Sequence, residues 1–342
     1  MSAIDLTSLG WDDYFADQFI PYAETHQPGR VARVDRGAVT ALTSTGPIRA
    51  AVDPDQQPTV GDWVALADEP PCVDAVLPRR SAIARGSATG TSTSQVLAAN
   101  VDVVFVALPL ATPKLGLVER LITLVWESGA TPVVLLTKAD LAPDSDAVVA
   151  DVAASAPGVD VSPISSLTGD GIEAITSYIG GARTVAILGQ SGVGKSTLVN
   201  RLVGAEVLST GAIRDDGKGR HTTTHRELVP LPTGGVLIDT PGLRGVALTD
   251  AEEGLAQTFA DIEDLTEHCY FADCAHETEP GCAVLAALSD GSLAQRRYDS
   301  WRKLLREARW MASRTDARLA AEQRRKWKIV TKEVRRSGRT RR

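Results

Sequence analysis

The sequence predicts a protein of three domains: a small β-barrel, a central α/β domain and a C-terminal helical domain that holds a metal. Short Val- and Ala-rich segments separated by turn residues fill positions 28–85, and apolar strands alternate with helices from Asn100 on. The strand pattern stops near residue 250, before a cluster of Cys and His. A chain of 342 residues has room for more than one core, since single cores stop growing near about 250–300 residues.

Composition excludes several classes of protein. Hydrophobic residues make up 43% and charged residues 23% of the chain, which rules out wholesale disorder and a collagen-like fibre. Four cysteines are too few for a disulfide scaffold. The N-terminus has no basic segment followed by an apolar run, and the strongest apolar stretch, residues 101–110, is about half a membrane span. We therefore expect a protein of the reducing cytoplasm that has no membrane contact.

Charge is distributed unevenly along the chain. Residues 296–342 contain 18 Lys and Arg against five Asp and Glu, although the whole chain has a net charge of −7. A basic tail on an acidic body is the electrostatic footprint of a polyphosphate partner, because each cationic contact releases condensed counterions. A solvated helix end is the alternative explanation.

The first domain is predicted from about five short strands between residues 28 and 85. Such a set suggests a small closed barrel, and an oligonucleotide-binding (OB) barrel fits the size, as do barrels of other topology. A Gly-, Ser- and Thr-rich stretch follows, which is typical of a linker. The predicted boundaries are 1–85 for the barrel with an N-terminal extension, 86–99 for the linker, 100–248 for the α/β domain and 249–342 for the helical domain with its basic tail.

The central domain alternates strands and helices. Residues 101–110 and 131–136 read as buried strands on either side of a helix over 115–128, and 184–188 and 236–238 repeat the strand signal. This alternation implies a parallel, doubly wound sheet whose ligand sites lie at the carboxyl ends of the strands.

A phosphate-binding loop is the sharpest signal. GQSGVGKS at 189–196 follows the strand TVAIL and opens a helix, which is the context this pattern requires. Its glycines let backbone N–H groups surround a β-phosphate, Lys195 reaches the β- and γ-phosphates, and Ser196 can ligate Mg²⁺. The predicted nucleotide-binding residues are Gly189, Gln190, Ser191, Gly192, Val193, Gly194, Lys195, Ser196 and Thr197. A nucleoside triphosphate is the expected ligand.

A second element identifies the base as guanine. VVLLTKAD at 133–140 delivers Thr137, Lys138 and Asp140 into a loop after a strand. An aspartate there accepts hydrogen bonds from guanine N1–H and the 2-amino group, whereas adenine would leave the carboxylate unpaired. Alone this match could be an ordinary turn, but paired with the phosphate loop it indicates GTP and GDP. ISSLTGDGI at 164–172, with Ser165 and Ser166, is predicted to support the guanine loop.

Two further segments supply candidates for magnesium and the γ-phosphate. One threonine of GRHTTTHREL, most plausibly Thr223, is expected to close on Mg²⁺ when GTP is bound. VLIDTPG places Asp239 at a strand end for the water shell of Mg²⁺, and the Gly242 N–H for the γ-phosphate. A Ser/Thr-rich loop without function is the alternative for the first segment.

The sequence offers three candidates for the group that orients the attacking water. Leu243 stands where many GTPases carry a glutamine, and a leucine cannot orient water. The candidates are His221, a group supplied by a partner, and an activating K⁺; His221 could equally be a surface histidine. We expect slow intrinsic turnover and strong stimulation by whatever the barrel and basic tail bind.

The order of these elements is unusual, because the base-reading loop precedes the phosphate loop. The α/β domain is therefore predicted to be circularly permuted. A permutation preserves the packed sheet but moves the chain ends, so the segment after Gly242 leads directly into the C-terminal domain.

The C-terminal cluster has the spacing of a metal site. Cys269-x4-Cys274-x-His276-x5-Cys282 offers three thiolates and an imidazole, which suit one structural, tetrahedral Zn²⁺. A set of buried free thiols is the alternative. Cys72, in the barrel, is interpreted as a small core residue.

The motifs together resemble the ribosome small subunit-dependent GTPase A family, the circularly permuted GTPases of bacteria. The likeness rests on T-K-A-D at 137–140, G-Q-S-G-V-G-K-S at 189–196, G-R-H-T-T-T at 219–224, D-T-P-G at 239–242 and the Cys/His cluster. It implies an OB barrel, a GTPase domain and a zinc domain in a monomer. It also implies binding to the small (30S) ribosomal subunit and its rRNA late in maturation, with GTP hydrolysis triggered there and release afterwards.

By the same resemblance, His221 positions the water and acts with Lys195 and Thr223 in catalysis. Thr137 departs from the commoner asparagine, but its hydroxyl can still brace the phosphate loop.

Two functions remain in view. The first is an enzyme whose hydrolysis is coupled to maturation and release; the second is a GTP-dependent rRNA-binding checkpoint in which hydrolysis is only a slow timer. Thr137, Lys138 and Asp140 disfavour a third, an ATP-dependent motor. Turnover with and without ribosomal subunits discriminates between the first two.

Overall fold

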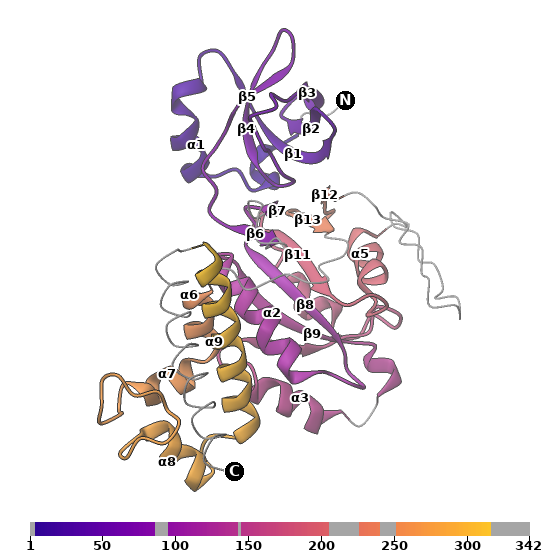
Figure 1. Ribbon diagram of the computed structural model, residues 1–342. Coiled ribbons are helices and arrows are strands. Elements are labelled where there is room, and N and C mark those ends of the chain that lie inside the picture. The colour runs from indigo at the N-terminus through magenta and orange to yellow at the C-terminus, as the bar shows by residue number, and fades with distance from the viewer. Residues whose placement is uncertain (1–3, 86–94, 143–144, 205–225, 240–250, 316–342) are drawn as a thin grey trace, which may run out of the picture. The chain divides into compact units, whose positions relative to one another are not determined.

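The computed structural model describes residues 4–85, 95–142, 145–204, 226–239 and 251–315. They form two compact units: the first contains the barrel and the α/β sheet, and the second contains the C-terminal helices (Figure 1). The predicted fold class is confirmed, since the first unit combines a closed five-stranded barrel with a parallel α/β sheet and the second is helical.

The barrel has the connectivity of an OB-like fold. Its strands are β1 (Gln27–Asp35), β2 (Ala38–Thr43), β3 (Gly46–Ala51), β4 (Trp63–Ala67) and β5 (Cys72–Val76). They follow the order β1-β2-β3-β5-β4, and β4 pairs back with β1 to close the barrel. Alternate residues such as Val31, Val39 and Leu66 fill the interior. Cys72 lies in β5 but is only half-buried, so its interpretation as a core residue was wrong.

The N-terminal segment packs against the barrel. It contains the 3₁₀ turns η1 (Leu6–Leu9) and η2 (Ile20–Tyr22) and the helix α1 (Asp13–Phe19). Trp11 and Phe15 lie 4.7 and 5.9 Å from the ring of Trp63. These aromatic contacts bury a large apolar area, which attaches the extension to the barrel.

The end of the predicted linker is a strand. β7 (Gln95–Ala99) pairs antiparallel with β6 (Ala82–Arg85) in a separate two-stranded sheet. Leu97, Ala98 and Ala99 are buried. The Ser/Thr-rich composition before these residues does not reveal that they are buried in a hairpin. The predicted linker over 86–99 is therefore wrong at 95–99.

The α/β sheet contains six strands. They are β8 (Val103–Pro109), β9 (Thr131–Thr137), β10 (Asp160–Pro163), β11 (Thr184–Gly189), β12 (Glu227–Pro230) and β13 (Val236–Asp239), in the spatial order β10-β9-β8-β11-β13-β12. The first five in this order are parallel, and β12 runs antiparallel to β13. The four strands that precede the phosphate loop in the chain, β8 to β11, lie together on one side of the sheet, and the two that follow it, β12 and β13, lie on the other side. This arrangement is the predicted circular permutation.

Helices cover both faces of this sheet, as predicted for a doubly wound fold. Val104 and Val106 pack in one core with α2 (Leu115–Glu127) and α3 (Asp146–Ala154). Phe105, between them in the chain, points to the opposite core with α4 (Ile172–Thr176) and α5 (Lys195–Val203). Alternation of side chains across the strand produces this division.

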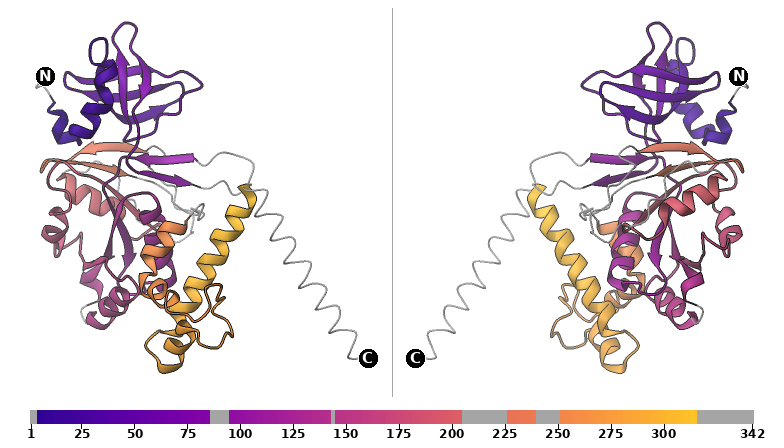
Figure 2. Two further views of the ribbon diagram at one scale, coloured as in Figure 1. Left: turned by 90° about the vertical axis from the view of Figure 1, so that its left-hand side faces the viewer. Right: turned by 90° about the vertical axis from the view of Figure 1, so that its right-hand side faces the viewer.

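Over its described residues, the second unit consists of helices joined by loops, the longest of which lies between α7 and α8. Its helices are α6 (Glu252–Thr258), α7 (Ala260–Thr266), α8 (Ala283–Asp290) and α9 (Gln295–Thr315), the last a single continuous helix (Figure 2). Arg297 of α9 is buried, pairs with Asp261 at 2.6 Å and donates to the Thr258 carbonyl at 2.9 Å. These bonds connect α9 to α6 and α7. Among the described residues, no helix combines the length and the apolar character needed to cross a membrane.

Candidate functional site

The phosphate loop joins β11 to α5 at the carboxyl edge of the sheet. Gly189 lies so close to β8 that a Cβ there would collide with the Ala107 carbonyl oxygen. Gly194 has φ of 100°, a left-handed conformation that suits glycine, and α5 begins at the next residue. The free N–H groups at the start of α5 therefore face the loop, which is the arrangement that binds phosphate.

The side chain of Lys195 lies within this loop. Its Nζ donates to the Gly189 carbonyl at 2.9 Å and to the Gln190 carbonyl at 2.8 Å. Ser196 follows it in the first turn of α5 and is half-buried. The ammonium group and the hydroxyl are thus next to the backbone amides that would surround the phosphates.

Residues of the predicted base-reading loop brace the phosphate loop. The hydroxyl of buried Thr137, at the end of β9, donates to the Val193 carbonyl at 2.7 Å, with the Leu108 carbonyl at 3.1 Å. Lys138 has φ of 61° and donates from Nζ to the Gly192 carbonyl at 2.8 Å. Two segments more than 50 residues apart are therefore joined into one site.

Asp140 is held by the second predicted guanine loop. It lies in η3 (Ala139–Leu141) and is exposed, and its Oδ1 accepts a hydrogen bond of 2.6 Å from the fully buried Ser165. The Ala139 N–H donates to the Ile164 carbonyl at 3.1 Å, which joins the two loops at the backbone as well. Ser166 follows in the same loop and is half-buried. The carboxylate is oriented while it remains accessible to a base.

Asp239 ends β13 at the same edge of the sheet. It pairs in register with Ile187 of β11, two residues before Gly189, and is 7% exposed. Burial raises the pKa of Asp239, and the positive charge of Lys195 acts in the opposite direction. A buried carboxylate in this position favours a nearby cation.

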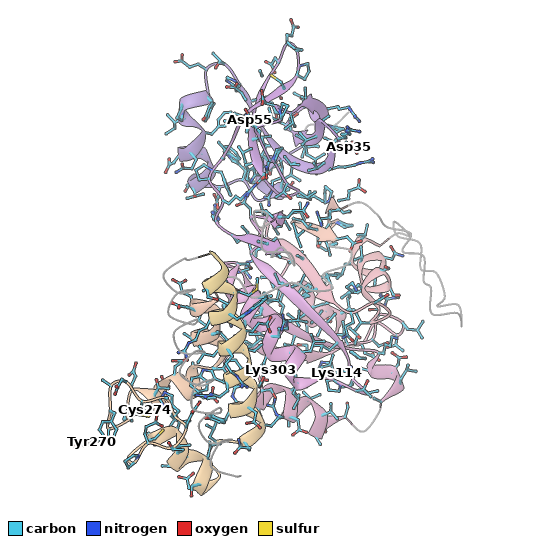
Figure 3. The ribbon with its side chains drawn as sticks, in the orientation of Figure 1. Asp35, Asp55, Lys114, Tyr270, Cys274 and Lys303 are labelled. Atoms are coloured by element: carbon cyan, nitrogen blue, oxygen red, sulfur yellow. The ribbon has the colours of Figure 1, made fainter. Side chains whose placement is uncertain are left out.

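The cysteine and histidine side chains of the second unit converge in the loop between α7 and α8, where Figure 3 labels Cys274. Sγ of Cys269 and Sγ of Cys282 each lie 3.5 Å from Nδ1 of His276 and 3.8 Å from one another. With Cys274 included, all four donor atoms lie within 4.8 Å of one another. The group could hold one metal ion.

The surrounding residues shift the pKa values of two of the thiols in opposite directions and bond the backbone of the histidine. Burial raises the pKa of Cys269, but N–H groups of Ala283 and Val284 at the start of α8 act against it, and the net shift is downward. Burial and the neighbouring thiols raise the pKa of Cys274 to about 11. The Tyr298 hydroxyl donates to the His276 carbonyl at 2.6 Å. Such contacts around the ligands orient a metal site.

Glu279 organises the backbone of the cluster loop. Its carboxylate accepts N–H bonds from Ala275, Glu277 and Thr278 at 3.0, 2.8 and 2.9 Å. These bonds lower the pKa of Glu279 to about 2. Neither Glu279 nor Tyr298 was predicted from the sequence. Glu279 lies between His276 and Cys282 in the cluster pattern, and this position is the one signal that could have indicated its role.

Comparison with known proteins identifies the family. A sequence model described as RsgA GTPase matches residues 76–249. A relative from Streptomyces coelicolor, named small ribosomal subunit biogenesis GTPase RsgA, is 51% identical over 337 residues, covering 94% of this chain and 92% of the relative. The chain belongs to the RsgA GTPase family. It is a GTP hydrolase.

Other RsgA relatives and solved structures agree. A relative of the same name from Streptomyces avermitilis is 52% identical over 341 residues, covering 96% of this chain and 92% of the relative. The crystal structure of YjeQ from Thermotoga maritima is 26% identical with a TM-score of 0.63, and the match covers 82% of this chain and 98% of that one. The structure of YloQ, titled a circularly permuted GTPase, is 24% identical with a TM-score of 0.60, covering 82% and 94%, and shows the same fold.

The described residues of this RsgA family member bring most of the predicted site residues together. The phosphate loop, the predicted base-reading residues and Asp239 share one edge of the sheet, and the four predicted metal ligands share one loop. The predicted residues that lie outside the described ranges are His221, Thr223, Gly242 and the basic residues after 315. His268 is exposed, and its ring nitrogen bonds the Asp264 carbonyl at 2.7 Å rather than joining the cluster.

Proposed function

We propose that this chain binds the small (30S) ribosomal subunit and couples GTP hydrolysis to late maturation of the subunit and to its own release. The observation that carries the proposal is the connection of the base-reading loop to the phosphate loop by Thr137 and Lys138, because it builds one site for a guanine nucleotide. The relatives at 51% and 52% identity are named small ribosomal subunit biogenesis GTPases. Those names favour a coupled enzyme over a checkpoint protein that uses hydrolysis as a timer.

In the proposed site, the Asp140 carboxylate accepts hydrogen bonds from guanine N1–H and the 2-amino group. Ser165 orients this carboxylate, and Ser166 lies in the supporting loop. The amides of residues 189–197 bind the phosphates, and Lys195 leaves its carbonyl partners for the β- and γ-phosphates. Ser196 and Thr223 would hold Mg²⁺, Asp239 would accept hydrogen bonds from its water ligands, and the Gly242 N–H would donate to the γ-phosphate. The ion neutralises charge that develops on the phosphates during transfer.

For water positioning we propose His221, acting with Lys195 and Thr223. A group of the subunit and a K⁺ ion are the other candidates for this role. A group supplied by the subunit predicts slow turnover without the subunit, whereas activation by K⁺ predicts a rate that depends on K⁺.

For the cluster of Cys269, Cys274, His276 and Cys282 we propose one structural Zn²⁺. Tetrahedral zinc with Zn–S of about 2.3 Å and Zn–N of about 2.0–2.1 Å requires S···S and S···N separations of about 3.8 and 3.5 Å. Cys269, His276 and Cys282 have separations of 3.8 and 3.5 Å, and all four donor atoms lie within 4.8 Å of one another. Structural zinc of this kind stabilises a small helical domain directly.

We further propose that the barrel and the basic tail contact rRNA, and that the protein acts as a monomer in the cytoplasm. The tail, residues 296–342, supports this proposal because it contains 18 basic and only five acidic residues. We keep the predicted domain boundaries at 85 and 248, but not the linker boundary at 99, since residues 95–99 form β7.

The test is GTP hydrolysis by the purified protein alone, with purified small subunits, and with large subunits. Stimulation by small subunits of about 10-fold or more, with none by large subunits, is the expected result. A slow rate that neither subunit changes would contradict the proposal and would favour the checkpoint function.

A further inference from the structure

The barrel is hydrogen-bonded to the strand that neighbours Asp239. Arg33 of β1 pairs antiparallel with Glu227 of β12, and Glu227 pairs in turn with Asp239 of β13. Strands in a sheet lie about 4.8 Å apart, so the barrel strand is about 10 Å from the backbone of Asp239. β12 has four residues and would be the edge of the α/β sheet without the barrel.

The barrel also packs against β13 directly. Ala32 and Val60 of the barrel share one hydrophobic core with Leu228 of β12 and Ile238 of β13. Gly61, which has φ of 92°, approaches so closely that a Cβ there would lie 2.9 Å from Ile238 Cδ1 and would collide with the Ala99 carbonyl oxygen. The turn that contains Gly61 therefore lies against the residue that precedes Asp239.

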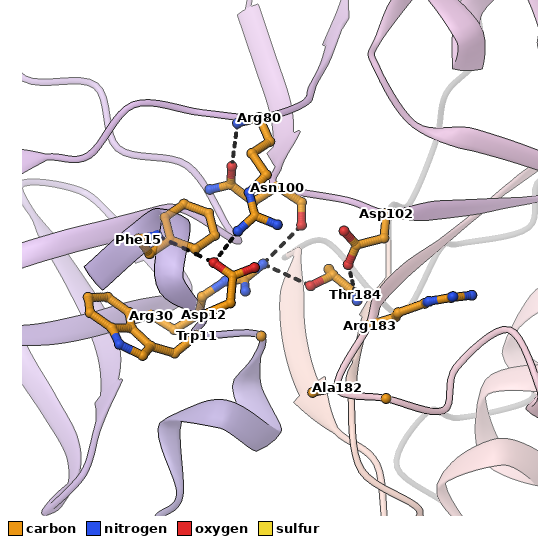
Figure 4. Close-up of a pocket in the computed structure, with 12 residues that line it drawn as sticks. Trp11, Asp12, Phe15, Arg30, Arg80, Asn100, Asp102, Ala182, Arg183 and Thr184 are labelled. Atoms are coloured by element: carbon orange, nitrogen blue, oxygen red, sulfur yellow. Dashed lines mark hydrogen bonds and ion pairs between the residues drawn. The ribbon is translucent and has the colours of Figure 1, made fainter. Parts of the chain in front are cut away.

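A buried arginine attaches the barrel at a third point. Arg30 of β1 is fully buried and donates to the carbonyls of Leu9 and Asn100 at 2.6 and 3.1 Å and to the Thr184 hydroxyl at 2.9 Å. Figure 4 shows the bonds to Asn100 and Thr184 beside a cavity of about 220 Å³ between the barrel and the start of β11. Thr184 is the first residue of β11, the strand that ends at the phosphate loop.

We propose that the barrel positions Asp239 for GTP hydrolysis, with Gly61 and Ile238 as the positioning residues. The inference rests on the proposed role of Asp239 at the magnesium site. Strand pairing and a shared core hold β12 and β13 from the side of the barrel, so a change at the barrel reaches Asp239 through two adjacent strands. The Arg30 bond to Thr184 holds the neighbouring strand β11. The guanine loop lies after β9 and β10, at the other end of the sheet, and is not touched by Gly61.

The test compares two glycine substitutions in the barrel. Gly61→Ala inserts a methyl group that would collide with the Ala99 carbonyl oxygen and lie 2.9 Å from Ile238 Cδ1, so the turn must shift away from both. Gly37→Ala, in the turn between β1 and β2, is also at positive φ but meets nothing within 4 Å. We expect Gly61→Ala to lower kcat about 10-fold or more and to change the KM for GTP less than about twofold, since displacement of a positioned group by about 1 Å acts mainly on the reaction step. Gly37→Ala should keep wild-type kcat.

Hydrogen exchange supplies a readout that does not depend on activity. Amides of β12 and β13 should exchange about 10-fold faster in Gly61→Ala than in Gly37→Ala, while those of β9 are unchanged. If Gly61→Ala does not fold, Ile238→Val removes the contacting methyl group, and Ile175→Val, in the opposite core, is its control. The same differences are expected for that pair.

A folded Gly61→Ala protein with wild-type kcat and wild-type exchange in β12 and β13 would overturn the positioning role. Failure of the proposed function has a different signature, because the wild-type protein itself would then show no stimulation by small subunits. In that case, basal kcat and exchange rates of the variants still decide whether the barrel positions Asp239.

Discussion

The hydroxyl of Ser165 donates a hydrogen bond of 2.6 Å to Oδ1 of Asp140, across 25 residues of chain. Ser165 is fully buried and Asp140 is exposed, so the bond orients a carboxylate that still faces solvent. One lone-pair direction of Asp140 is used inside the protein, and the rest of the carboxylate is available for a base. Nucleotide affinity should therefore depend on a residue that need not touch the nucleotide.

Ser165→Ala should weaken GTP and GDP binding about 5- to 30-fold, because a hydrogen bond to a charged group contributes about 1–2 kcal/mol once solvent screening of the exposed partner is included. Titration with a fluorescent GDP analogue measures the loss. Ser155→Ala is the control, since Ser155 is equally buried but bonds the Asp151 carbonyl in α3. Equal affinities of the two variants would show that Ser165 does not orient Asp140.

Thr137→Val should lower the free energy of unfolding by about 1–3 kcal/mol, because it leaves the Val193 and Leu108 carbonyls without their buried donor. It should also weaken nucleotide binding, since Val193 belongs to the phosphate loop. Urea unfolding gives the stability change. Thr123→Val, at a buried threonine of α2, is the control and should leave nucleotide affinity unchanged. If Thr137→Val also bound nucleotide with wild-type affinity, Thr137 would not brace the phosphate loop.

Cys274→Ser should reduce bound zinc from about one ion per chain and lower the melting temperature of the C-terminal unit, because a structural zinc site needs all four ligands. Guanine nucleotide binding should persist, since the nucleotide site lies in the other unit. Elemental analysis and calorimetry are the measurements. Cys72→Ser, outside the cluster, should retain the metal. The same zinc content in both variants would reject the site.

Asp239→Asn should raise the free energy of unfolding at pH 7 in the absence of Mg²⁺. Burial raises the folded-state pKa of Asp239 above 3.8, so ionisation destabilises the fold. This destabilisation is complete above the raised pKa and disappears as the pH falls toward the unfolded value of 3.8. Urea unfolding at pH 7 and near pH 4 tests this, with Asp151→Asn, an exposed carboxyl of α3, as the control. If Asp239→Asn were less stable than the wild-type protein at pH 7, the upward direction of the Asp239 pKa shift would be contradicted.

The chemistry of the site could be predicted because its parts are local in the chain. The phosphate loop, the segment Thr137–Asp140 and the Cys/His cluster each combine residue types and spacing that suit one ligand. The main strands β8, β9 and β11 were also predicted, since long apolar runs indicate burial on both faces. The strands β10 and β12 were not predicted, because four residues ending in proline are too few to show a period.

The sequence by itself determined the domain types, the permuted order of the nucleotide motifs and the four Cys and His residues that could hold a metal ion. Only the tertiary structure decided that Ser165 orients Asp140, that Arg30 reaches Thr184 across 154 residues, and that β1 of the barrel extends the α/β sheet beside Asp239. The physical reason is that a hydrophobic pattern reports which face of a segment is buried, while its packing partner is selected by the shape and hydrogen-bonding groups of distant segments.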